Sequence, residues 1–165
     1  MIQFISTNKA QSSMDLAIAL FIFLLAILSF FIYSLNFSQE TQENFDLLSY
    51  DGNIIMKSIL SDGSPQEWNS NNVIKIGILS NNKINSTKLE QFYSLSVSDY
   101  QKTKTLFNTR FNYYFFLSEK ISDEINGIGK PGTDKNNIQS NNLMKITKFT
   151  IYNDKPVTAY LYIWE

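Results

Sequence analysis

The chain has 165 residues, enough for one globular core or for one small domain with an appendage. It contains no Cys and no His, so the usual ligands of structural zinc, the thiol nucleophile, disulfides and the neutral-pH proton shuttle are missing. Fourteen basic and fifteen acidic residues give a net charge of -1 without a basic stripe, so we expect no nucleic-acid partner. The composition is 44% hydrophobic with a mean hydropathy of only -0.15, so the apolar residues must be concentrated in one region.

Much of this apolar excess lies in an uncharged run of 20 residues, Leu16 to Leu35. As a helix the run would be about 30 Å long, which is the hydrocarbon thickness of a bilayer. A secretory signal peptide has a shorter apolar stretch, about 7–15 residues, followed by a small-x-small cleavage site. Here Asn36-Phe37-Ser38-Gln39-Glu40 follows instead, so the run predicts a membrane-spanning helix.

The charges on either side of the run predict its orientation. Lys9 precedes it, and Glu40, Glu43 and Asp46 follow it. By the positive-inside rule, the first ten residues lie in the cytoplasm and the bulk of the chain lies outside.

An acidic residue, Asp15, directly precedes the run. A carboxylate there costs up to about 2.5–3.5 kcal/mol if drawn to the membrane centre, and less at the interface. One interpretation is an acid in the first turn of the helix, favoured by about 0.3–1 kcal/mol at the positive end of the helix dipole, with Ser12 or Ser13 as the N-cap. The alternative is that the carboxylate has a charged partner.

The string KAQSSMDLAIAL resembles the class III signal peptide of archaeal type IV pilins. In that family a short polar leader ends in a basic and a small residue, and Gln-x-Ser-x-acid and an unbroken hydrophobic stretch follow. The matching residues are Lys9, Ala10, Gln11, Ser13 and Asp15. Ala10 stands where the family more often has Gly, and Asp15 stands where it more often has Glu.

The resemblance implies that a membrane prepilin peptidase cleaves between Ala10 and Gln11, removing residues 1–10 as a leader and leaving 155 residues (165 minus 10). It further implies that residues 11–35 of many copies bundle into a filament core, where Asp15 meets the N-terminal amine of a neighbouring subunit. Opposite charges about 4 Å apart at an effective dielectric constant near 20 attract by about 4 kcal/mol, which offsets part of their desolvation. Cleavage would then act as an assembly switch, because it creates that amine on Gln11.

Beyond the apolar run, residues 36–61 are expected to continue the helix in amphipathic form. Gly52 interrupts this segment and is expected to bend it. Together the two parts would make the membrane anchor and packing spine of a lollipop-shaped pilin. Apolar residues recur near helical spacing, namely Phe37, Phe45, Leu48, Ile55 and Ile59.

Residues 62–165 are expected to form an extracytoplasmic, β-rich head. Asp62-Gly63-Ser64-Pro65 should end the helix, with Trp68 anchoring the turn onto the head. The expected elements are a strand over 73–79, a turn over 81–83, a short helix capped by Thr87 with Glu90, a second helix from Ser98, an aromatic strand over 111–117, a mobile loop over 126–142, and a β-hairpin of 143–152 and 156–164 around Asn153-Asp154-Lys155.

These elements predict an α+β fold with a small, mainly antiparallel sheet against the long N-terminal helix and two short helices. The head also resembles archaeal pilin-like subunits, by weaker signals: Gly63-x-Pro65-x-x-Trp68, Ile76-Gly77-Ile78, Lys88-Leu89, Asp99-Tyr100 and a last strand ending in Trp164.

No catalytic constellation is evident, so we expect neither enzyme activity, a metal nor a cofactor. Asp123 and Glu124 lie in a polar stretch rather than in the apolar surroundings that tune an acid and a base. The glycines at 127, 129 and 132 lack the Gly-Lys-Ser/Thr of a phosphate loop. Two Asn-x-Ser/Thr sequons make Asn36 and, in a predicted turn, Asn85 possible glycosylation acceptors.

The sequence therefore predicts a type IV pilin-like precursor, major or minor, that enters the membrane, is cleaved and polymerises into an archaeal surface filament. By the resemblance, its partners are the membrane, copies of itself or related pilins, the prepilin peptidase, an assembly ATPase and a membrane platform protein. The alternative is an uncleaved, single-pass membrane protein with an extracytoplasmic binding head.

Overall fold

The computed structural model describes residues 7–122, 125–140 and 142–165, and it describes only the backbone of residues 7–13 and 36–43. The chain divides into two compact units, Met1–Glu43 and Asn44–Glu165. The helix α1 (Thr7–Ile59) contains the whole apolar run and ends close to the predicted boundary. It begins earlier than predicted, so Ser12 and Ser13 lie inside the helix and do not cap it. No Gly or Pro stands between Thr7 and the run, and extending a formed helix costs little.

Within the second unit, the last turns of α1 bury one face in the core. Of the residues expected on this face, Leu48 is buried and Phe45 is 36% exposed. The side chain of Phe37, also expected there, lies outside the described residues. Residues three, four and seven apart share a helix face, which explains the buried set of Leu48, Ile55, Met56 and Ile59.

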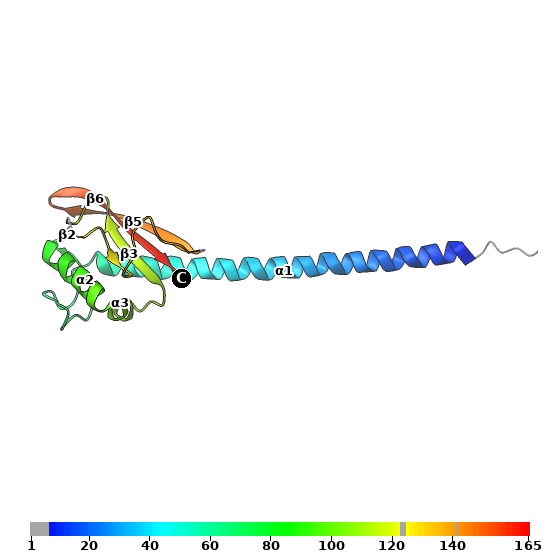
Figure 1. The fold of residues 1–165 in the computed structure, drawn as a ribbon, viewed down its shortest axis with the longest axis horizontal. Helices are drawn as coiled ribbons and strands as arrows, with labels where there is room; N and C mark the ends of the chain where they lie inside the picture. Colours follow the sequence, from blue (N-terminus) through cyan, green and yellow to red (C-terminus); the bar gives the residue numbers. More distant parts are fainter. Residues whose placement is uncertain (1–6, 123–124, 141) are drawn as a thin grey trace, which may run out of the picture. The chain divides into compact units, whose positions relative to one another are not determined.

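A four-stranded antiparallel sheet packs on this face, in the order β4-β3-β6-β5. Its strands are β3 (Asn112–Leu117), β4 (Ile128–Gly129), β5 (Leu143–Tyr152) and β6 (Lys155–Trp164). In Figure 1, β3, β5 and β6 lie alongside the last turns of α1. Alternate residues of β3 and β6 point into the core, among them Tyr113, Phe115, Leu161 and Ile163, each fully buried. The predicted aromatic strand and the predicted hairpin are thus confirmed.

The helix α1 continues through Gly52 without a break, and the sheet lies close to the helix backbone at this position. A Cβ atom at this position would collide with the Cδ1 of Ile146 and would come within 3.1 Å of the Cγ2 of Ile163. Glycine in a helix interior costs about 1 kcal/mol relative to alanine, and here that cost allows β5 and β6 to pack directly on the helix backbone.

We expect Gly52→Val to lower the free energy of unfolding of the head by about 1–3 kcal/mol, because the added carbons overpack a core that has no space for them. The neighbour Asn53→Val provides the control, since the Asn53 side chain is exposed and donates to Ser49 O of the same helix. Urea unfolding of the two variants should separate them; equal midpoints would contradict the close approach.

The segment after α1 closes the helix end and does not form the predicted strand over 73–79. Ile78 N donates to Ile59 O at 2.8 Å and Leu79 N donates to Ser61 O at 2.9 Å, so these N–H groups satisfy carbonyls at the helix end. In place of the expected strand, the described structure has a single β-bridge, between Ser64 and Lys75, and the two-residue strand β1 (Leu79–Ser80).

The predicted turn and Trp68 anchor at this end are confirmed. Gly63 takes a positive φ of 77°, and the Trp68 indole is buried and donates to Gly77 O at 2.7 Å. Asn81 and Asn82, both with positive φ, then connect β1 to β2 (Lys83–Ile84) in a two-residue hairpin.

The two predicted helices are present as α2 (Ser86–Ser98) and α3 (Tyr100–Phe107), but α2 begins two residues earlier than a Thr87 cap requires. The cap is Asn85, whose side-chain oxygen accepts from Lys88 N at 3.1 Å. Asn is among the most favourable N-cap residues, so it starts the helix before Thr87 can. Asp99 caps α3 in the same way through Lys102 N.

The expected loop over 126–142 is irregular except for β4, which the sequence analysis did not predict. Two of its three glycines are needed for close packing. A Cβ on Gly127 would collide with the Tyr114 ring, and one on Gly129 would collide with Tyr113 O. The loop also places Ile138 on the outer face of the sheet, against the cluster of Tyr114, Phe116 and Trp164.

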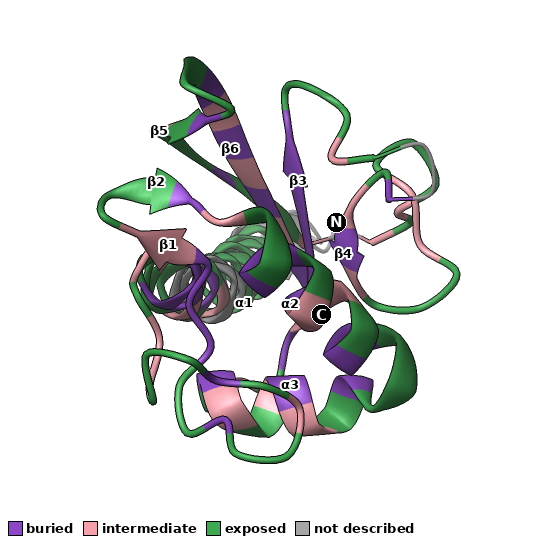
Figure 2. Ribbon diagram, turned by 90° about the vertical axis from the view of Figure 1, so that its left-hand side faces the viewer, coloured by how far each residue is buried: buried purple, intermediate pink, exposed green. Residues whose placement is uncertain are grey.

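The second unit is therefore α+β with an antiparallel sheet, as predicted. Figure 2 shows the buried residues concentrated between the sheet, the end of α1 and the two short helices.

Candidate functional site

The first candidate site is the apolar part of α1. Met14–Leu35 has a mean hydropathy of 2.9 and is the one helix in the described part of the chain that is long and apolar enough to span a membrane. None of its most apolar 18-residue window is buried; Leu16 is 73% exposed and Phe30 69%. In water such an apolar surface would be strongly unfavourable, at about 25 cal/mol per Å². This segment therefore requires an apolar environment of lipid or of other apolar helices.

Backbone and side-chain polar groups inside this segment are compatible with that environment. A helix satisfies its own backbone groups, which lipid cannot do. Ser29 Oγ donates to Leu25 O at 2.8 Å, so this hydroxyl is also satisfied within the helix.

The residues of the predicted cleavage motif are on the first turns of α1. Lys9, Ala10, Gln11 and Ser13 belong to the helix, while their side chains lie outside the described residues. The Asp15 side chain is exposed, and it forms no ion pair with any residue that the structure describes.

The two predicted glycosylation acceptors differ in their surroundings. Asn85 is half-buried; its oxygen caps α2, and its nitrogen donates to Ser80 Oγ at 3.4 Å. A glycan on this nitrogen would have to replace that bond. Asn36 is in α1, and its side chain is among those not described.

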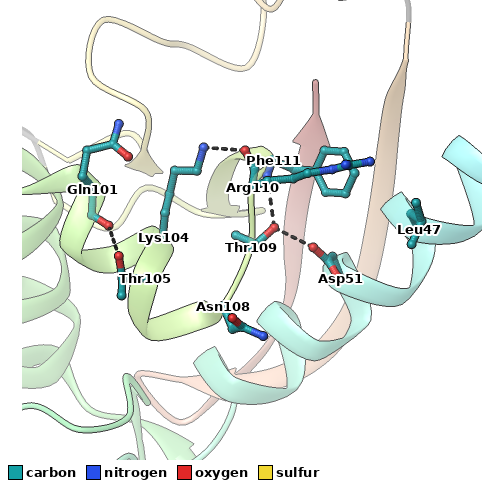
Figure 3. A pocket seen from close by; sticks show the side chains of 9 residues that line it. All are labelled: Leu47, Asp51, Gln101, Lys104, Thr105, Asn108, Thr109, Arg110 and Phe111. Atoms are coloured by element: carbon teal, nitrogen blue, oxygen red, sulfur yellow. Dashed lines mark hydrogen bonds between the residues drawn. The ribbon is translucent and has the colours of Figure 1, made fainter.

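The second candidate site is a cavity of about 680 Å³ in the head, beside α1 and α3 (Figure 3). Its charged residues are Asp51, Lys104 and Arg110. Sequence reasoning did not single it out, because its residues come from three separate segments without a motif. The remaining lining residues are Leu47, Gln101, Thr105, Asn108, Thr109 and Phe111.

The polar groups of this cavity are mostly bonded to one another, as the dashed lines in Figure 3 show. Asp51 Oδ2 accepts from Thr109 Oγ1 at 2.7 Å, and Thr109 Oγ1 accepts from Phe111 N at 3.2 Å. Lys104 Nζ donates to Arg110 O at 2.6 Å. These bonds connect the segment that precedes β3 with α1 and with the end of α3. The polar groups of the cavity therefore have a structural role.

The charges of the cavity do not form an acid and base pair. Burial, and then the charge of Lys130, lowers the pKa of the Lys104 ammonium from its ordinary value. The guanidinium of Arg110 lies 5.0 Å from the centre of the Phe111 ring, a cation–π arrangement. The only carboxylate here, Asp51, is bonded to Thr109, and no group of three metal-ligating residues occurs among the described side chains.

A network of buried polar groups surrounds β3 in the head. Tyr113 Oη donates to Thr103 Oγ1, Thr103 Oγ1 donates to Tyr100 O, and Tyr100 Oη accepts from Tyr113 N, at 2.5, 2.7 and 3.0 Å. Burial raises the pKa of Tyr100 to about 12, and it raises the pKa of Tyr113 as well. Both phenols therefore stay protonated at neutral pH and join α3 to the sheet.

Comparison with protein-family models, with curated proteins and with solved structures found no match to this chain.

Proposed function

We propose that this protein is the precursor of a type IV pilin-like subunit that is cleaved between Ala10 and Gln11 and polymerises through the apolar part of α1 into a surface filament. The observation that supports this most is the 22-residue helical segment Met14–Leu35, with its apolar side chains exposed all round. A helix that is apolar on every side must be solvated by lipid or by similar helices. In this proposal, lipid surrounds the segment in the precursor and copies of the chain surround it in the filament.

The position of Asp15 supports polymerisation over simple anchoring. It stands at the start of the apolar segment, exposed and without an ion pair to any described residue. In the proposed filament, the new ammonium group on Gln11 of a neighbouring subunit neutralises it, and the pair sets the axial register of the helices. In a membrane anchor that does not polymerise, no neighbouring subunit would offset the cost of this carboxylate next to the apolar segment.

The proposed work is structural and not enzymatic. The head has a core of aromatic and aliphatic residues, and internal hydrogen bonds hold the cavity beside α3 together. The prepilin peptidase, an assembly ATPase and a membrane platform protein would be separate partners.

N-terminal sequencing of the protein from membranes and shed filaments tests the proposal. We expect a chain that starts at Gln11. The alternative, an uncleaved single-pass protein with an extracytoplasmic binding head, predicts a chain that starts at Met1. A start after Leu35 would show removal of the whole apolar segment and would also contradict the proposal.

A further inference from the structure

The strand β5 forms one edge of the four-stranded sheet, and one side of its backbone is unpaired. All ten residues from Leu143 to Tyr152 are in register with β6. The short strand β2 lies close to β5, but within the described part of the chain no backbone hydrogen bond joins β5 to any segment other than β6. In Figure 2, β5 lies at the outside of the sheet beyond β6, with much of its surface exposed. An unpaired strand of this length is a template for another strand.

The turn between β5 and β6 determines which groups point outward. Asn153 and Asp154 have positive φ values of 51° and 61°, as a two-residue type I′ hairpin requires. Tyr152 and Lys155 then form the hydrogen-bonded pair next to the turn, and pairing alternates from there. The N–H and C=O groups that point away from β6 therefore belong to Leu143, Lys145, Thr147, Phe149 and Ile151.

The side chains of these same residues lie on the outer face of the sheet, and all five are exposed. Phe149 is 83% exposed, more than any other large apolar side chain that the structure describes. The Lys145 ammonium lies 4.3 Å from the centre of the Tyr160 ring on the neighbouring strand. An apolar ring thus stands at the edge of a strand whose backbone is open to pairing.

We propose that β5 is a self-association edge, which pairs antiparallel with β5 of a second copy about a two-fold axis through Thr147. In this register Thr147 lies opposite its own copy, and each Lys145 lies opposite the Phe149 of the other chain. The ammonium can then contact an aromatic ring across the interface at two symmetric places. The outward N–H and C=O groups of both chains pair, and each Phe149 ring is partly covered by the Lys145 side chain of the other chain.

Charge favours this register over the two that are centred on a lysine. The strand carries two lysines, Lys145 and Lys148, and no acid. Like charges placed directly opposite each other destabilise a strand pair. With Thr147 at the centre, Lys148 lies opposite Ile146, so no lysine faces a lysine. A register centred on Lys145 or Lys148 would place that residue opposite its own copy. The proposed pairing does not depend on the filament assignment.

Cross-linking of the full chain in detergent tests this proposal. The protein has no cysteine, so Thr147→Cys introduces a single thiol. Paired strands hold directly opposite Cα atoms about 5.5 Å apart, within the range that a disulfide can bridge. We expect Thr147→Cys to form a disulfide-linked dimer under mild oxidation. Ile74→Cys, 74% exposed and outside the sheet, is the matched control and should remain largely monomeric. Equal cross-linking of the two variants would overturn the proposal.

Charge variants at Phe149, combined with Thr147→Cys, test the register. Phe149→Lys should weaken dimer formation about tenfold, because each new lysine at position 149 would lie opposite Lys145 of the other chain. The two-fold symmetry makes this like-charge pair occur twice. Phe149→Glu should retain the dimer, since the new carboxylate faces Lys145, and the double variant Lys145→Glu with Phe149→Lys should restore it. Dimerisation that is indifferent to these changes would show that another surface brings the thiols together.

Discussion

Replacing Asp15 by Asn should leave cleavage after Ala10 intact and should lower incorporation of the subunit into filaments by about a hundredfold or more. The expected size follows from the attraction between a carboxylate and an ammonium group, up to about 4 kcal/mol at 4 Å, where 1.4 kcal/mol corresponds to a factor of ten. Asn has nearly the same shape as Asp, so the packing of the helix is preserved while the charge is removed.

Two measurements on the same cells test this expectation. N-terminal sequencing of the membrane fraction should give Gln11 for Asp15→Asn, and quantification of the subunit in sheared filaments should show its loss. Asp15→Glu is the matched control, because it keeps the charge and adds one methylene; it should assemble. Normal filaments from Asp15→Asn would refute the charge-pairing argument, and loss of cleavage would move the role of Asp15 to peptidase recognition.

Replacing Lys88 by Met should destabilise the head by about 3–5 kcal/mol. Lys88 is only 4% exposed, and its ammonium donates to Asp62 O at 2.8 Å and to Leu79 O at 2.9 Å. Hydrogen bonds from a charged group contribute about 1.5–3 kcal/mol each. Met fills nearly the same volume but cannot donate, so two carbonyls lose a donor next to the end of α1.

Lys102→Met is the matched control for this change. The Lys102 ammonium also donates to a backbone carbonyl, Ser70 O at 2.7 Å, but the residue is only half-buried, so water can replace the bond. We expect a loss of about 1 kcal/mol for this variant. Urea unfolding of the detergent-solubilised proteins measures both. Similar losses in the two variants would show that burial of the Lys88 ammonium adds nothing.

Sequence patterns predicted the elements whose signals are local. The Asn153-Asp154 turn lies between two alternating strands, and both the turn and the strands formed as expected. The apolar run needs no tertiary context, because its length and composition alone make it a candidate membrane span.

The elements that sequence misjudged are those whose backbone is used by a distant segment. The alternation over 73–79 predicted a strand, but the N–H groups of Ile78 and Leu79 bond the end of α1. Gly52 suggested an interruption of the helix, because the sequence shows that a side chain is missing but does not show Ile146 and Ile163, which leave no room for one. β4 was missed because two residues paired with β3 leave no periodic signal.

The cavity beside α3 could not be predicted for a similar reason. Asp51 and Thr109 are 58 positions apart, and only the fold brings them to 2.7 Å. The residues of the predicted cleavage motif, in contrast, are contiguous, and their proposed role depends on a peptidase and on neighbouring subunits rather than on contacts within the chain.

The locations of the two tryptophans bear on how this protein can be studied. Trp68 and Trp164 are the only tryptophans in the sequence, and both are buried in the second unit, at 1% and 4% exposure. Intrinsic tryptophan emission should therefore report unfolding of the head alone, without a signal from the apolar helix in lipid or detergent. Circular dichroism, to which the 53 residues of α1 contribute heavily, would report on the helix as well. Recorded together, the two signals would distinguish a head that melts on an intact anchor from a chain that unfolds as one unit.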